Sequence, residues 1–107
     1  MSKTIQKTVC NDLKILPQYF LPVFTGKKTF EIRYNDRNFH TGDFIRLREW
    51  SNGEYTGNYV VKQITYILRD GMYGLRDGFV GLALSNKDFG NQILGIEPLE
   101  SGVESNE

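Results

Sequence analysis

The sequence predicts an α+β protein that is mostly β, with five to six strands curled into a small barrel and one or two short helices. Three observations predict this fold class. Apolar and polar residues alternate along several segments, which is the period of a β-strand. Turns rich in Gly and Asn separate those segments, and helical spacing occurs in one short stretch. A chain of 107 residues can bury one hydrophobic core and is too short for two domains.

A strand and a short helix are the first predicted elements. Residues 13–16 are apolar enough for a strand, and Pro17, which follows, suits the first turn of a helix. Helical spacing is shown by Tyr19, Phe20, Val23 and Phe24. Gly26 suits the helix end, while Pro22 removes one backbone hydrogen bond inside the segment. We therefore expect a helix that is short, bent or partly 3₁₀.

The remaining elements are predicted to be strands. Over residues 29–34 the apolar side chains share one face and the polar side chains share the other. Asn52 and Gly53 form a typical hairpin turn, because this pair tolerates positive φ. Residues 70–78 predict an exposed loop at the rim of the fold. Further strands are expected at 44–50, 59–69 and 79–84, and residues 93–96 predict a short edge strand or a packed tail.

Composition and charge divide the chain into three parts. Residues 1–10 predict a flexible N-terminus, residues 11–98 a single domain and residues 99–107 a disordered acidic tail. The 13 basic residues balance the 13 acidic ones. Because three of the glutamates lie in the tail, residues 1–98 have an excess of three basic residues. That excess permits an anionic partner without requiring one.

Several classes of protein are excluded by the sequence. A membrane-spanning helix needs about 18 consecutive apolar residues, which are absent, and the N-terminus lacks the apolar region of a signal peptide. The lone Cys10 and the single His40 cannot supply a disulfide or a zinc cluster. We expect a reduced, cytoplasmic protein with no cofactor, no bound metal and no membrane contact, and we assume a monomer.

The densest polar cluster follows the predicted helix. Alternation places Glu31 and Arg33 on one side of a strand, roughly 7 Å apart. Lys28 has the wrong parity for that side, so it must lie in the helix–strand turn or be moved by a bulge. Asp36 and Arg37 extend the cluster. The alternative is that these charges form a solvated strand edge.

A second cluster combines arginines with the one tryptophan. Arg46, Arg48 and Trp50 share one face of a strand, and Ile45 and Leu47 share the other. An arginine beside an exposed aromatic ring can stack bases and bind phosphates. The alternative is that Trp50 belongs to the core.

Residues 26–33, Gly-Lys-Lys-Thr-Phe-Glu-Ile-Arg, resemble the Gly-x-Lys-x-x-Glu-x-Arg signature of the ASCH domain in the PUA-like superfamily. Residues 13–15, 42–50 and 66–68 resemble a small bacterial and phage branch of that family, whose function is unknown. The similarity covers roughly residues 11–84. It implies a closed β-barrel, a cleft between the first helix and the barrel, and RNA or a nucleotide-like molecule as ligand.

Carried over from the family, Lys28, Glu31 and Arg33 become the candidate site, and Gly26 permits the tight turn before it. One enzymatic branch of the family deacetylates a modified cytidine with a threonine nucleophile three residues after the lysine. Glu31 occupies that position here, so the resemblance favours binding over catalysis. All expected ligand-binding residues, including the weaker candidates, are Lys14, Lys28, Glu31, Arg33, Asp36, Arg37, Arg48, Trp50 and Tyr73.

Three functions remain open at this point. The favoured one is an RNA- or nucleotide-binding module. The second is an amidohydrolase acting on an acetylated nucleoside, with Lys28 as base and Glu31 as acid or water-positioning group. The third is a non-catalytic protein-interaction adaptor in which the motif is an ion-paired structural edge.

Overall fold

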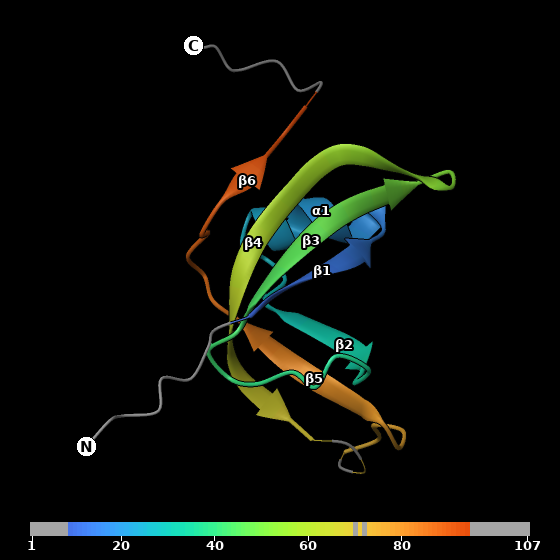
Figure 1. Ribbon diagram of the computed structural model, residues 1–107, viewed down its shortest axis with the longest axis vertical. Helices are drawn as coiled ribbons and strands as arrows, with labels where there is room; N and C mark the ends of the chain where they lie inside the picture. The colour runs from blue at the N-terminus through green and yellow to red at the C-terminus, as the bar shows by residue number, and fades with distance from the viewer. Residues whose placement is uncertain (1–8, 70, 72, 95–107) are drawn as a thin grey trace, which may run out of the picture.

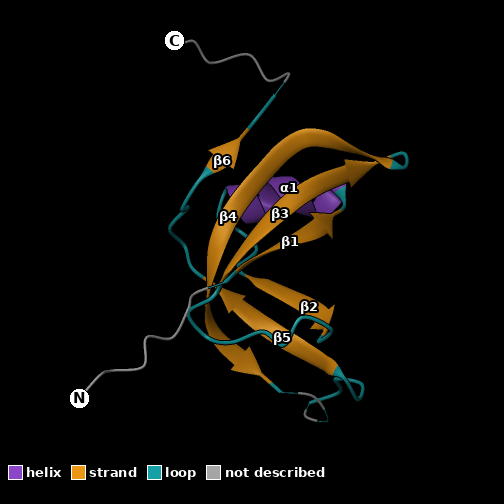
Figure 2. Ribbon diagram, in the orientation of Figure 1, coloured by secondary structure: helices purple, strands orange, loops and turns teal. Residues whose placement is uncertain are grey.

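A computed structural model of the chain describes residues 9–69, 71 and 73–94 (Figure 1). Most of the described residues that lie in regular structure are in strands, with a single helix behind them (Figure 2). The predicted α+β, mostly β fold is therefore confirmed. The elements are β1 (Cys10–Ile15), α1 (Pro17–Phe24), β2 (Phe30–Tyr34), β3 (Phe44–Ser51), β4 (Glu54–Leu68), β5 (Phe79–Leu84) and β6 (Asn91–Gln92).

The described strands form one sheet in the order β1-β3-β4-β5-β2, and β6 pairs with β4. β1 runs parallel to β3, and the other pairs are antiparallel. β4 pairs with β3 through residues 54–63 and with β5 through residues 64–68. This long strand therefore belongs to two wings (Figure 1). The first wing contains β1, β3, β6 and the beginning of β4; the second contains the end of β4, β5 and β2.

The sheet is not closed into a barrel, so the barrel expected both from the strand pattern and from the resemblance is wrong. β1 and β2 lie at the two ends of the strand order, and the ribbons diverge from each other (Figure 1). Side chains span this open edge, which we call the seam. Arg33 donates to the carbonyl of Lys14, and Arg37 Nη1 donates to the carbonyl of Asp12 at 2.8 Å. At the seam, hydrogen bonds from arginine side chains to β1 carbonyls thus replace the backbone hydrogen bonds that would join two paired strands.

Helix α1 begins and ends as its sequence indicates. Pro17 opens the helix, and the Leu16 carbonyl accepts hydrogen bonds from the backbone N–H groups of Tyr19 and Phe20. All eight residues are α-helical despite Pro22. Gly26 follows the helix at φ 83°, a left-handed conformation that favours glycine and lets the chain turn back toward β2.

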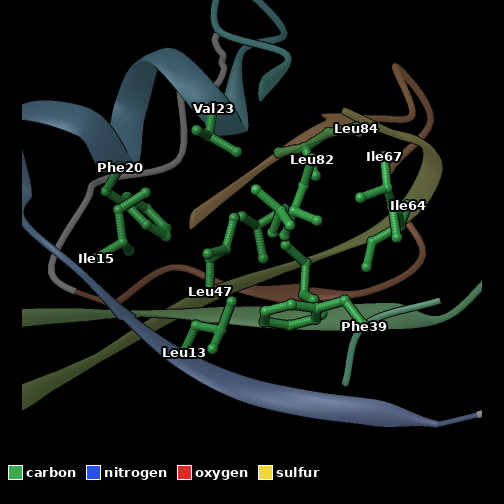
Figure 3. Packing of buried hydrophobic residues seen from close by; sticks show 13 residues of the cluster. Leu13, Ile15, Phe20, Val23, Phe39, Leu47, Ile64, Ile67, Leu82 and Leu84 are labelled. Carbon is green, nitrogen blue, oxygen red and sulfur yellow. The ribbon is translucent and has the colours of Figure 1, made fainter. Parts of the chain in front are cut away.

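Both wings and α1 contribute to one hydrophobic core (Figure 3). Ile45 and Leu47 of β3 are fully buried, and Phe20 and Val23 of α1 pack into the same cluster. The predicted division of β3 into an apolar inner face and a polar outer face is confirmed. The other core residues are Leu13, Ile15, Phe39, Val60, Ile64, Ile67, Val80, Leu82 and Leu84.

The strand ends differ from the sequence expectation in detail. Cys10 starts β1 although it falls in the predicted flexible N-terminus. The last strand is at Asn91–Gln92, and Ile93 packs against the core just after it. The predicted tail over residues 99–107, like Ile96, lies outside the described residues. In the described part of the chain no helix is long and apolar enough to cross a membrane.

Candidate functional site

Strand β2 is inverted relative to an ordinary amphipathic strand. Its apolar side chains are about half exposed, at 51% for Phe30, 51% for Ile32 and 58% for Tyr34. Glu31, in contrast, is only 6% exposed. It lies opposite the buried Leu82 of β5, and Arg33 lies opposite the buried Val80. The polar face of β2 therefore points inward, and the solvated-edge alternative is wrong for Glu31.

Glu31 is buried as a paired carboxylate. Its Oε1 lies 2.6 Å from Nζ of Lys28, and its Oε2 lies 2.9 Å from Nε of Arg33. Each carboxylate oxygen thus accepts from one cation. A buried charge is costly unless it is paired and hydrogen-bonded, and both conditions hold here. The residues of the signature form one ion-pair cluster.

Lys28 reaches Glu31 because the chain folds back after α1. Its own backbone N–H donates to the carbonyl of Pro22 at 2.9 Å, which fixes the turn against the helix. The side-chain Nζ also donates to the Phe30 carbonyl at 2.7 Å. Lys28 lies between α1 and β2, so the first of its two predicted placements, in the helix–strand turn, is confirmed.

A groove of about 600 Å³ runs along this cluster at the seam. Of the nine predicted residues, it brings together Lys14, Lys28, Glu31 and Arg33. The wall also contains four aromatic rings that were not predicted as site residues, Tyr19, Phe30, Tyr34 and Phe79, together with Ile15, Leu16 and Ile32. Sequence spacing could not identify these rings, because they come from three elements whose approach depends on the tertiary fold.

The groove combines positive charge with aromatic surface. Two cations, Lys28 and Arg33, pair with the one carboxylate of Glu31, so the cluster retains an excess of positive charge. A lysine ammonium has three donor hydrogens, and two of those of Lys28 are bound within the protein. Arg33 likewise keeps donors beyond the two that bind Glu31 and Lys14. The remaining donors can bind an anion, and the rings can hold a flat apolar group.

The same geometry bears on the amidohydrolase alternative. A general base must accept a proton, whereas Nζ of Lys28 donates to two acceptors, the Glu31 carboxylate and the Phe30 carbonyl. This arrangement adds no support to hydrolysis, which stays a prediction. Among the described residues no group of three or more His, Cys, Asp or Glu side chains could hold a metal ion.

A second polar surface lies on the outside of the first wing. We call it the basic–aromatic face, and it consists of Lys14, Arg46, Arg48, Trp50, Tyr55 and Tyr59. Trp50 is partly buried rather than part of the core cluster, and its ring meets Tyr55 edge-on with centroids 4.8 Å apart. The predicted sharing of one face by Arg48 and Trp50 is confirmed by their contacts with the same Tyr55 ring, although the pairing with β4 shifts register between the two residues.

Asp12 organises this face, although no motif in the sequence singles out this residue. It receives two hydrogen bonds from Arg46, both 2.7 Å, and its Oδ2 lies 3.6 Å from Nη1 of Arg48. The hydrogen bonds from Arg46 hold the pKa of Asp12 below its ordinary value. The same contact raises the pKa of Arg46. The parallel pairing of β1 with β3 creates this contact, and no local pattern indicates that pairing.

Besides Arg48 and Trp50, three more of the predicted residues do not line the groove, and these three are not part of the basic–aromatic face either. Asp36 and Arg37 follow β2 and pair with each other at 3.4 Å on the surface. Tyr73 lies in the loop between β4 and β5, is 84% exposed and is not among the residues that line the groove. The ligand-binding roles suggested for these residues stay predictions.

Comparisons with known proteins place the chain in a family. Residues 10–84 match the family described as "Domain of unknown function (DUF3850)", and this range includes every residue that lines the groove. The chain belongs to this family. A similar protein of Escherichia phage P2, described as "Uncharacterized 12.9 kDa protein in GpA 3'region", is 42% identical over 55 residues. Those residues cover 51% of this chain and 50% of the phage protein, about half of its length. Neither description mentions an ASCH or PUA-like domain, so that resemblance stays a prediction.

Proposed function

We propose that this DUF3850 chain binds RNA or a nucleotide-like ligand in the groove at the seam. One observation supports this most strongly: the buried Glu31 carboxylate holds Lys28 and Arg33 side by side in a groove lined by aromatic rings. Phosphate needs cationic donors and a base needs a flat apolar surface. The groove supplies both within one small volume.

Each residue has a distinct part in the proposed binding. Lys28 and Arg33 donate to a phosphate, and Lys14 adds positive charge from the other side of the seam. Glu31 positions the two cations and accepts from a base or ribose donor. The groove's volume of about 600 Å³ is typical of a small-ligand site, so it suits one or two nucleotides.

The proposal has two further parts. The ASCH-like assignment accounts for why the Lys, Glu and Arg of the signature converge at one site. A cytoplasmic location fits an RNA ligand and a lone Cys10 with no partner for an internal disulfide. With no net charge on the whole chain, binding should depend on the groove rather than on a broad electrostatic field.

The test is a fluorescence-anisotropy titration with single-stranded RNA, hairpin RNA and matched DNA at two salt concentrations. Lys28→Gln should weaken RNA binding by about 10-fold or more, because a charge-assisted hydrogen bond is lost. Lys27→Gln is the matched control, since Lys27 is the exposed neighbouring lysine and does not line the groove. It should change the affinity by less than about 2-fold.

Two results would overturn the proposal. One is the absence of binding to every RNA and DNA tested. The other is an equal loss of affinity in Lys28→Gln and Lys27→Gln, which would mean that general charge rather than the groove determines binding. Thermal unfolding of both variants shows whether each remains folded at the titration temperature.

A protein-interaction adaptor is the second candidate function. The half-exposed apolar side chains of Phe30, Ile32 and Tyr34 on an edge strand favour it, because such surfaces commonly mediate protein contacts. A photocrosslinking residue at position 32 tests this candidate in the producing cell. A specific crosslinked protein would favour the adaptor, and crosslinking to nucleic acid alone would exclude it.

A further inference from the structure

The basic–aromatic face lies outside the groove and has no part in the proposed nucleotide site apart from Lys14. Ile45 and Leu47 of β3 point into the core with α1, so Arg46 and Arg48 point to the opposite, outer side of the first wing. Figure 2 shows α1 behind the strands of this wing, which leaves the outer side of β3 uncovered by the helix.

Three cations on this face each lie over an aromatic ring. The distances to the ring centroids are 3.9 Å for Lys14 Nζ over Trp50, 3.7 Å for Arg48 Cζ over Tyr55 and 5.1 Å for Arg46 Cζ over Tyr59. Strand pairing places Lys14, Arg48 and Tyr59 in one row across β1, β3 and β4. Arg46 lies on the same face, one step of roughly 7 Å along β3.

We propose that this face binds the continuation of a single-stranded nucleic acid whose end or single nucleotide occupies the groove. The ligand is then a strand of several nucleotides rather than a free nucleotide. This inference rests on the function proposed above. Lys14 connects the two surfaces, because it lines the groove while its Nζ lies over the Trp50 ring.

The chemistry of the face suits such a strand. The guanidinium plane of Arg48 packs on Tyr55 and can accept a base on its other side, which extends the stack. Lys14 and Arg48 can also donate to phosphates. The Asp12 carboxylate, which lies beside Arg46 one step along β1 from Lys14, already accepts two hydrogen bonds from Arg46, and the three cations leave this face an excess of positive charge.

The inference is tested by comparing the affinities of a short and a longer RNA. Anisotropy titrations compare a labelled RNA dinucleotide with a single-stranded RNA of about ten nucleotides, and matched DNA is included. We expect the longer RNA to bind the wild-type chain at least about 10-fold more tightly, because stacking contributes substantially for each added base. The fluorescence of Trp50, the one tryptophan of the chain, should change with the longer RNA and not with the dinucleotide.

The variant Arg48→Gln/Tyr55→Leu should lose this gain with length and keep the dinucleotide affinity of the wild type. Neither residue lines the groove. Arg69→Gln is the matched control, since Arg69 is exposed just after β4 and is not part of either surface. Arg69→Gln should bind the longer RNA more tightly than the dinucleotide by the same factor as the wild type. If the double variant unfolds, Arg48→Gln alone replaces it, with thermal unfolding as the check.

The outcomes separate this inference from the proposed function. Equal wild-type affinity for both lengths, or a length dependence that Arg48→Gln/Tyr55→Leu leaves unchanged, would overturn the inference and leave the groove proposal intact. Absence of binding at both lengths would overturn both. Tighter binding of the longer RNA that disappears in the double variant and persists in Arg69→Gln would support the outer face as a second binding surface.

Discussion

Strands β2 and β3 have the same alternating pattern and opposite orientations. In β3 the apolar Ile45 and Leu47 are fully buried and the arginines face outward. In β2 the apolar Ile32 is half exposed and Glu31 is buried. An alternating sequence therefore indicates that a strand has one apolar and one polar face, but it does not indicate which of the two faces is buried.

The neighbours of each strand account for the difference. β3 lies between β1 and β4 and packs against α1, so its inner face meets apolar surface from several elements. β2 lies at the seam, where Lys28 returns from the helix and can neutralise an inward carboxylate. The inward Glu31 carboxylate is tolerated in β2 because the two cations that pair with it, Lys28 and Arg33, lie close to it in the sequence.

The largest expected effect comes from truncating an inward side chain of β3. Leu47→Ala should lower the free energy of unfolding by about 2–5 kcal/mol, because Leu47 is fully buried. Ile32→Ala in β2 should cost less than about 1 kcal/mol, because half of that side chain is already exposed. Urea unfolding measures both. Similar losses in the two variants would contradict the inversion of β2.

The next effect tests the inward charge of β2. Glu31→Leu should lower the free energy of unfolding by about 1–3 kcal/mol, because Lys28 and Arg33 lose their shared acceptor. Glu54→Leu is the matched control, since Glu54 is exposed at the start of β4. A Glu31→Leu variant as stable as the control variant would show that the ion-pair cluster has no structural role.

Another inward charge lies in β4, and among the residues that the structure describes no carboxylate forms an ion pair with it. Lys62 is 2% exposed, and its Nζ donates to the Asn86 carbonyl at 3.1 Å. Lys62→Met keeps the volume and removes the buried ammonium, so we expect an increase of about 1 kcal/mol in the free energy of unfolding. Lys62→Ala should be less stable than Lys62→Met. A Lys62→Met variant less stable than the wild type would show that the buried ammonium stabilises the fold.

The smallest effect concerns pH and the outer face of the first wing. Arg46 lowers the pKa of Asp12 below its usual value of 3.8, so the ion pair stabilises the folded chain above that value. The contribution is lost as the pH falls through the lowered pKa of the folded state. Asp12→Asn should therefore melt below the wild type at pH 7, and the difference should shrink toward pH 2. A difference in melting temperature that grows as the pH falls would contradict this assignment. We expect a small difference at every pH because the Asp12 side chain is well exposed.

Local signals were sufficient for much of the fold. Pro17 and Gly26 mark the limits of α1, and residues 79–84 were predicted as the strand that β5 forms. Asn52 and Gly53 both adopt positive φ in the predicted turn, at 53° and 83°. These features depend on neighbours in sequence, so the sequence alone could predict them.

The orientation of β2 and the open seam could not be predicted in the same way. Both depend on where Lys28 and Arg33 meet other elements in space. For the candidate site, alternation predicted that Glu31 and Arg33 share one side of the strand, and the resemblance to the ASCH signature implied that Lys28 joins them. The sequence could not predict Tyr19 in the groove wall or Asp12 on the outer face, because tertiary packing alone brings them there.

The most direct test of a ligand groove along β2 at the seam is a backbone amide NMR titration of the isotopically labelled chain with an RNA dinucleotide. We predict that chemical-shift changes concentrate at residues 14–19 and 28–34, on both sides of the seam. Saturating RNA that leaves these amides unchanged, or shifts only amides distant from the groove, would contradict the account.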